Sequence, residues 1–155
     1  MSLDGTKLKK TGNSKNDDNA NFYGLDSILL ANGKNAVATV KNATLTSKAT
    51  GANGIFATNK GTVNVSNTKI KTTGKANSRG LDTTYGGKIN ANKVKISTKG
   101  DHSAAVATDR GGGTVIVKNA KVTTKGTGSP LAYSTGTINF NNVTGTAGCI
   151  NLSNF

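Results

Sequence analysis

The chain of 155 residues has no glutamate and no glutamine, and only one cysteine, one histidine and one proline. Without glutamate, its acidic side chains are seven aspartates, which leaves few carboxylates for the paired acid–base work of a glycoside hydrolase. The single cysteine, Cys149, excludes an internal disulfide, and we expect it to be a small buried residue. His102 alone cannot form a zinc site. No apolar run is long enough to span a membrane.

What the chain does contain is a repeat of about 26 residues. The segments Val63–Thr72, Ile89–Thr98 and Val115–Thr124 begin 26 residues apart, an earlier copy begins at Ala38, and a later one begins at Ile138. A fixed period of this size is the signature of a repeat architecture. Within each copy apolar and polar residues alternate, which is typical of half-buried strands. Strong helix formers never recur at helical spacing, so we expect no helix of useful length.

Each unit divides into three short strands, which cannot bury a core alone. Stacked units can, because each strand pairs with its counterpart one unit later. The sequence therefore predicts an all-β parallel β-helix, or solenoid, of about five coils, each with three short strands. Two inward apolar columns are expected, one of Val63, Ile89, Val115 and Ile138 and one of Leu45, Ile70, Ile96 and Val122. An antiparallel sandwich also uses short strands, but it gives no reason for side chains to repeat in register.

Asparagine occupies the corner between the second and third strands in all coils but one. The corner residues are Asn42, Asn67, Asn119 and Asn142, with Lys93 as the exception. Asparagine tolerates the left-handed backbone that a sharp bend needs. Stacked asparagine side chains can also form hydrogen bonds along the axis, as in fibrillar sheets.

Both ends of the chain resemble parts of a unit. Residues 7–12 resemble 69–74, the end of a unit, and residues 150–155 resemble 63–68, the start of one. We therefore interpret residues 1–23 as a partial coil with a polar loop at 13–19, residues 1–3 being an expression scar. Residues 24–155 form the repeat domain, truncated at its C-terminus. Truncated coils expose strand edges, which predicts end-to-end or edge association.

Glycine-rich strands of the form Gly-Gly-x-Ile/Val, the asparagine corners, and the run 124–130 followed by Tyr133-Ser134-Thr135-Gly136 carry a family resemblance. Over residues 24–146 the chain resembles the right-handed parallel β-helix proteins of the pectate-lyase-like superfold, especially the repetitive adhesin-like surface proteins of bacteria. The resemblance implies an extracellular or cell-surface location. It does not define a function, because this scaffold carries lyases, hydrolases, binding modules and passive stalks.

Twenty Lys and Arg residues give a formal net charge of +13, and the lysines share the repeat. The positions that recur are Lys69, Lys95 and Lys121 on the third strand, Lys41 and Lys118 before the corner, and Lys99 and Lys125 near the closing loop. Like charges stacked on adjacent strands repel, and a linear polyanion would offset that repulsion. We therefore hypothesise that these lysines bind an anionic glycan or cell-wall polymer. Alternatively they are ordinary outward lysines that keep the rod in solution. Specific nucleic-acid binding is not expected, because aromatic residues are sparse.

Two aromatic residues are candidates for stacking on a sugar ring. Phe56 alternates outward between Ile55 and Ala57, and Tyr85 lies in the adjacent turn one coil later. Packing in the core or in a turn is the alternative for both residues.

Catalytic constellations are weak. Asp26 and Asp82 take similar places two coils apart, which predicts a separation of about 9–10 Å, near the range of an inverting hydrolase. Asp82 and Asp109, with Arg79 and Arg110, could form a calcium-dependent lyase site like that of the pectate lyases that the chain resembles, but the acids are too few and too dispersed for a calcium site. We therefore expect no catalytic residues, no metal and no cofactor. The favoured interpretation is a non-catalytic binding segment, with a polysaccharide lyase or hydrolase and a purely structural stalk as alternatives.

Overall fold

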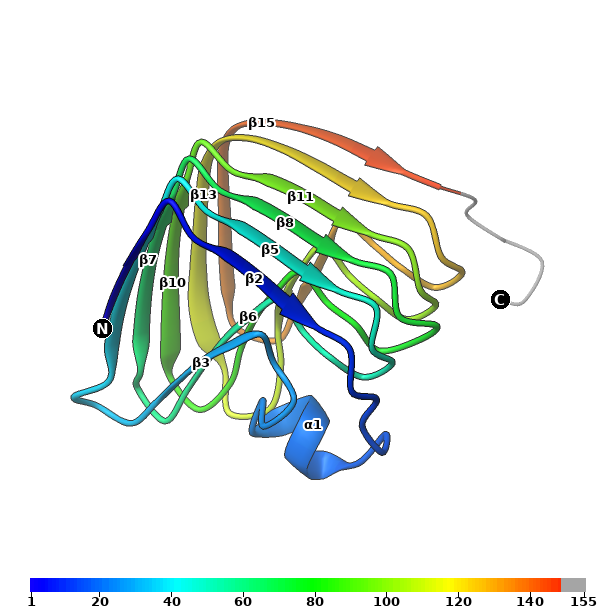
Figure 1. Ribbon diagram of the computed structural model, residues 1–155, viewed down its shortest axis with the longest axis horizontal. Coiled ribbons are helices and arrows are strands. Elements are labelled where there is room, and N and C mark those ends of the chain that lie inside the picture. Colours follow the sequence, from blue (N-terminus) through cyan, green and yellow to red (C-terminus); the bar gives the residue numbers. More distant parts are fainter. Residues whose placement is uncertain (149–155) are drawn as a thin grey trace.

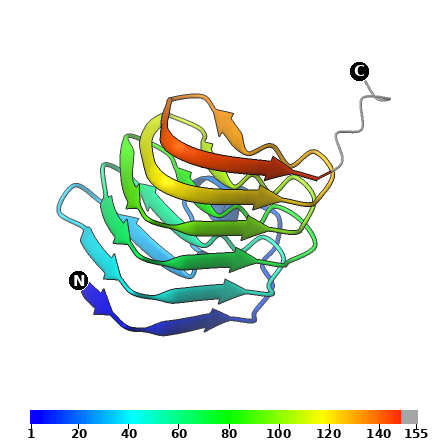
Figure 2. The ribbon, with the colours of Figure 1, turned by 90° about the horizontal axis from the view of Figure 1, so that it is seen from above.

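The structure is a computed structural model that describes residues 1–148. It is a parallel β-solenoid in which each strand pairs with its counterpart in the next coil (Figures 1 and 2). Val63 lies beside Ile89, and Ile89 lies beside Val115, so the register follows the 26-residue step. The predicted all-β solenoid of about five coils is confirmed.

The first strands of the coils form a five-stranded sheet, which we call the covered sheet. Its order is β14-β12-β9-β6-β3. The strands are β3 (Leu29–Asn32), β6 (Ile55–Thr58), β9 (Leu81–Thr83), β12 (Val106–Thr108) and β14 (Ala132–Ser134).

The second and third strands form one bent ten-stranded sheet that turns through the corner. The second strands are β1 (Ser2–Asp4), β4 (Val37–Lys41), β7 (Thr62–Ser66) and β10 (Gly87–Asn92). The third strands are β2 (Lys7–Lys10), β5 (Thr44–Ser47), β8 (Lys69–Thr72) and β11 (Lys95–Thr98). In the last two coils, β13 (Gly113–Thr124) and β15 (Thr137–Ala147) run through the corner without a break.

The core is a narrow column enclosed by these strands. Side chains at every second strand position point inward, and both predicted apolar columns are confirmed by the register. Val63, Ile89 and Val115 are fully buried, whereas Ile138 in the last coil is partly buried. Removing such side chains from water is the main favourable term for the fold.

The asparagine corners adopt the predicted left-handed backbone, with φ between 47° and 52°, and Lys93 has φ 54°. The expected ladder of hydrogen bonds exists on both sides of Lys93. The Asn67 amide donates to Asn42 Oδ1 at 3.4 Å, and the Asn142 amide donates to Asn119 Oδ1 at 2.8 Å. At Lys93 the ladder is interrupted, and Asn119 donates instead to Asn92 at 3.0 Å.

The N-terminal residues belong to the solenoid. β1 pairs with β4, and β2 pairs with β5 so that Leu8 lies beside Leu45, as the resemblance between 7–12 and 69–74 predicts. Ser2 and Leu3, which belong to the suggested expression scar of residues 1–3, form β1 together with Asp4. Cys149 and residues 150–155 lie outside the described residues. The predictions of a buried Cys149 and of association through the C-terminal coil therefore stay predictions.

Residues 13–28 differ from the polar loop that the sequence suggested, and we call them the cap. They contain the helix α1 (Asp18–Phe22), whose N-terminus is capped by the Asp17 side chain accepting from the Ala20 N–H at 3.0 Å. α1 is beside the covered sheet (Figure 1). No helix within residues 1–148 has the length and apolar character needed to cross a membrane.

Candidate functional site

The predicted column of third-strand lysines is present. Lys95 lies directly beside Lys69 on one side and beside Lys121 on the other, in three adjacent coils. The same position holds Thr44 in the coil before and Thr144 in the coil after, so the column ends after three lysines. All three side chains are exposed.

The other predicted lysines are distributed differently. Lys99 and Lys125 follow the paired residues Thr98 and Thr124, so they occupy equivalent positions in adjacent coils. By contrast, Lys41 and Lys118 share a strand position but are separated by Ser66 and Asn92 of the two intervening coils. Lys41 therefore lies apart from the other lysines, whereas Lys118 lies at the edge of their group.

Three central coils together present an exposed array that we call the lysine face. It spans residues 67–75, 92–99 and 118–125, which contain no aspartate. Its nine exposed lysines are Lys69, Lys71, Lys75, Lys93, Lys95, Lys99, Lys118, Lys121 and Lys125. None of them forms an ion pair within residues 1–148. Asp101 borders the face beside Lys75, but no aspartate lies within the face, so the face can attract an anionic partner over several ångströms.

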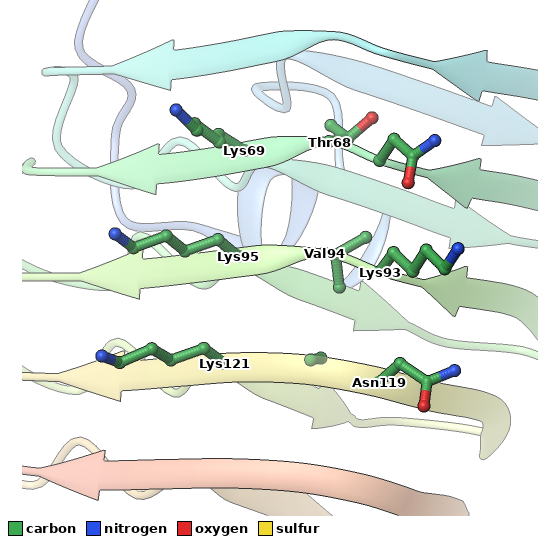
Figure 3. Close-up of a pocket in the computed structure, with 9 residues that line it drawn as sticks. Thr68, Lys69, Lys93, Val94, Lys95, Asn119 and Lys121 are labelled. Carbon is green, nitrogen blue, oxygen red and sulfur yellow. The ribbon is translucent and has the colours of Figure 1, made fainter.

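A shallow groove of about 470 Å³ crosses the lysine face at the corner (Figure 3). Its floor contains Thr68, Val94 and Ala120, which are buried. The three column lysines extend to one side of this floor, and Lys93 and Asn119 extend to the other side. A cationic wall, an amide-bearing wall and a small apolar floor are features that suit an elongated polar ligand with negative charges.

The covered sheet presents the opposite situation, because the cap lies on its outward residues. The Thr84 hydroxyl donates to the Phe22 carbonyl at 2.7 Å. Tyr23 stacks on Tyr85 with ring centroids 5.6 Å apart, and the Arg110 guanidinium lies 3.7 Å from the centre of the Phe22 ring. These contacts join residues that are about 60 or more positions apart in the sequence, and they fix the cap on the sheet.

A buried charge cluster lies beneath the cap. Arg79 forms ion pairs with Asp82 at 2.7 Å and with Asp109 at 3.2 Å. It also donates to the Asn21 carbonyl of the cap at 3.4 Å. Asp82 is fully buried, and its Oδ1 has no hydrogen-bond partner. The guanidinium therefore joins the cap, β9 and the turn after β12.

The two main members of this cluster have shifted pKa values. Burial raises the pKa of Asp82 to about 6, although the positive charge and hydrogen bond of Arg79 oppose the shift. The pKa of Arg79 is raised above its ordinary value, because the attraction to Asp82 and Asp109 outweighs the effect of burial. In a buried salt bridge, removal of one partner leaves an uncompensated charge and destabilises the fold strongly.

The expected exposure of Phe56 is wrong. Its side chain points away from the coil interior, but it is completely buried, since the backbone of Gly24 in the cap packs against its ring. Gly24 has φ +66°, and a Cβ there would lie 2.3 Å from Phe56 Cγ. Tyr85 is half-buried and stacked on Tyr23. Both aromatic residues therefore contact the cap: Phe56 has no exposed ring face, and one face of Tyr85 is covered by Tyr23.

The predicted pairing of Asp26 with Asp82 is also wrong. Register places Leu30 beside Phe56 and Phe56 beside Asp82, so Leu30 is the residue two coils from Asp82. Asp26 instead belongs to the cap, where it forms an ion pair with Lys10 at 2.7 Å. The error arose because Asp26 is off the 26-residue step, which leads from Asp82 through Phe56 to Leu30.

Sequence reasoning named Arg79, Asp82 and Asp109 together as a weak lyase candidate, but it missed that they form a structural cluster under the cap. It also missed a ladder in the closing loops, where the Ser78 N–H donates to Ser103 Oγ and the Ser103 N–H donates to Ser129 Oγ, each at 2.9 Å. The signal was present, since these serines recur at about the repeat step. No group of three or more His, Cys, Asp or Glu side chains suited to a metal occurs in residues 1–148.

Comparison of the chain with protein-family models, curated proteins and solved structures finds no match.

Proposed function

We propose that the lysine face binds a linear anionic polysaccharide without changing it chemically. The observation that carries this proposal is the register of Lys69, Lys95 and Lys121 on adjacent strands. Adjacent strands are about 4.8 Å apart, and like charges at that distance repel. A linear ligand that carries negative charges at a similar interval along its length offsets this repulsion.

The spacing favours a polysaccharide over nucleic acid. A sugar in an extended 1,4-linked chain advances by about 5 Å, close to the strand spacing of about 4.8 Å. The phosphates of one B-DNA strand advance by about 3.4 Å each along the helix axis, and they wind around that axis, so they would lose register with the straight column. The large apolar side chains that are exposed in residues 1–148, such as Tyr23, Tyr133 and Phe140, lie off the lysine face. The face therefore lacks the aromatic platform on which bases stack.

In this proposal the protein is an adhesin-like segment of a bacterial surface or secreted protein, and the solenoid presents the lysine face as a rigid array. A rigid array reduces the ordering cost of binding. A polysaccharide lyase or hydrolase finds no support in the geometry of Asp82, because the cap encloses that carboxylate. A purely structural stalk is the other alternative. It would not require aligned lysines, and their alignment would then result only from duplication of the repeat.

Titration with polygalacturonate tests the proposal. We expect binding at about 20 mM salt that weakens by roughly two to three orders of magnitude by about 200 mM, since counterions are released on binding. Dextran, which carries no charge, is the control polymer and should not bind. Absence of polygalacturonate binding at low salt would exclude the proposal, and formation of unsaturated products would favour the lyase.

A further inference from the structure

The two walls of the corner groove carry charges in an alternating arrangement. Lys69 and Lys121 lie on one wall, two coils apart. Lys93 belongs to the coil between them, and its side chain extends to the opposite wall (Figure 3). Asn67 and Asn119 line that same wall in the two flanking coils, so Lys93 is the cation there.

Lys93 occupies a position that the fold itself does not favour. It adopts φ 54° at a corner where four other coils have asparagine, a residue that accepts this backbone more readily than lysine does. It also interrupts the ladder, so Asn119 donates to Asn92 in place of a corner amide. A local departure from a structural rule within a repeat is expected where function requires it.

We propose that Lys93 is the specificity-determining residue of this groove and binds a carboxylate on the edge of a sugar chain opposite the edge held by Lys69 and Lys121. The inference rests on the proposed function and deepens it. In a ribbon-like 1,4-linked polyuronate, successive sugars are turned over, so their carboxylates point alternately to the two edges. With one sugar per coil of about 4.8 Å, the first, second and third carboxylates meet Lys69, Lys93 and Lys121.

The ligand class is therefore a uronate chain with an acidic group on every sugar, and the recognised unit is a trisaccharide. Val94 and Ala120 on the floor face the apolar surface of the central sugar. The amides of Asn67 and Asn119 lie beside Lys93, where they can form hydrogen bonds with sugar hydroxyls. Lys95, in the same coil as Lys93, adds a charge to the first wall without changing the alternation.

Calorimetric titration with mannuronate oligosaccharides of two to six sugars tests the inference on the full chain. We expect a large gain in affinity from the disaccharide to the trisaccharide and little gain beyond it. Lys93→Asn should lower trisaccharide affinity by roughly fivefold, as for one lost charge pair, and reduce the slope of log K against log salt by about one. Its melting temperature should equal or exceed that of the wild type, which shows that the loss is not misfolding.

Lys60→Asn is the matched control. Lys60 is also exposed and left-handed, with φ 66°, and it lies in the turn between β6 and β7, away from the groove. Lys60→Asn removes the same charge and places asparagine at the same kind of left-handed backbone position. Trisaccharide affinity should stay within about twofold of the wild type. If Lys93→Asn and Lys60→Asn behave alike while the wild type binds, the role of Lys93 is refuted and the proposed function stands. If the wild type binds neither oligosaccharides nor polygalacturonate, the proposed function itself fails.

Discussion

The covered sheet and the lysine face are built by the same repeat, yet their outward residues follow opposite rules. On the covered sheet the outward residues in register are all different: Leu30, Phe56, Asp82, Ala107 and Tyr133. On the lysine face one residue type recurs in three adjacent coils. The first surface is buried under the cap over most of its strands, and the second is exposed.

This difference shows how a repeat protein separates structure from recognition. A surface with a different residue in each coil fits a partner that does not repeat, and the cap is such a partner. A surface with the same residue in each coil fits a partner that repeats at the same step. On these two surfaces, the column of differing outward residues is mostly buried under the cap, and the column of identical lysines is left open to a polymer or to solvent.

The comparison predicts that substitutions on the two surfaces differ most in their effect on stability. Phe56→Ala should lower the free energy of unfolding by about 3–5 kcal/mol, because it leaves a cavity between Gly24 and the sheet. Lys71→Thr on the lysine face should change it by less than about 0.5 kcal/mol. Chemical denaturation of the purified proteins measures both effects. A cost for Phe56→Ala near that of Lys71→Thr would mean that the cap is not packed on the sheet.

The buried carboxylate under the cap should make stability depend on pH. Burial raises the pKa of Asp82 from 3.8 to about 6, so the native state holds this proton more tightly than the unfolded state. The contribution of Asp82 is therefore fully present below about pH 4 and is lost as pH rises through about 6. The loss amounts to at most about 3 kcal/mol.

Denaturation of the wild type at about pH 4.5 and pH 7.5 measures this effect, and Asp82→Asn is the matched control, because it keeps the shape and cannot ionise. The variant should lack the part of the pH dependence that comes from Asp82. A carbon chemical-shift titration of the Asp82 carboxyl group provides a reading that does not need the variant. A midpoint below about 4 would show that Arg79 outweighs burial and would reverse the sign of the prediction.

The coil architecture was predictable because the sequence pattern that encodes it is local and recurs in every coil. Alternation within strands such as 63–65 defines which side chains face inward, and the 26-residue step defines which strands are neighbours. The asparagine corners were predictable for the same reason, since asparagine is one of the few residue types that readily adopt the left-handed backbone of a bend between strands. The lysine column followed directly from the register.

The cap was not predictable, because it occurs once and its contacts are distant in sequence. Nothing near Phe22 indicates that its carbonyl will meet Thr84, and nothing near Asn21 indicates that it will meet Arg79. The residues of 13–19 are polar, which favours a loop, but polarity does not reveal where a loop packs. The same gap explains the burial of Phe56, which depends on Gly24 of the cap. The error at Asp26 has a different cause, because the 26-residue step from Asp82 leads to Leu30.

A small effect on stability is expected for the substitution that should matter most for binding. Replacing Lys69, Lys95 and Lys121 together by Thr, the residue at this position in the coils on either side, removes two repelling neighbour pairs. The unfolding free energy should stay constant or rise by up to about 1 kcal/mol, and any rise should shrink at high salt.

Polygalacturonate binding by this triple variant, measured across a salt series beside the wild type, tests the central claim most directly. If the lysine column holds the polymer, affinity at low salt should fall at least about tenfold, and the slope of log K against log salt should fall by about three. If the variant binds with the same affinity and the same slope as the wild type, the lysine column is not the binding surface.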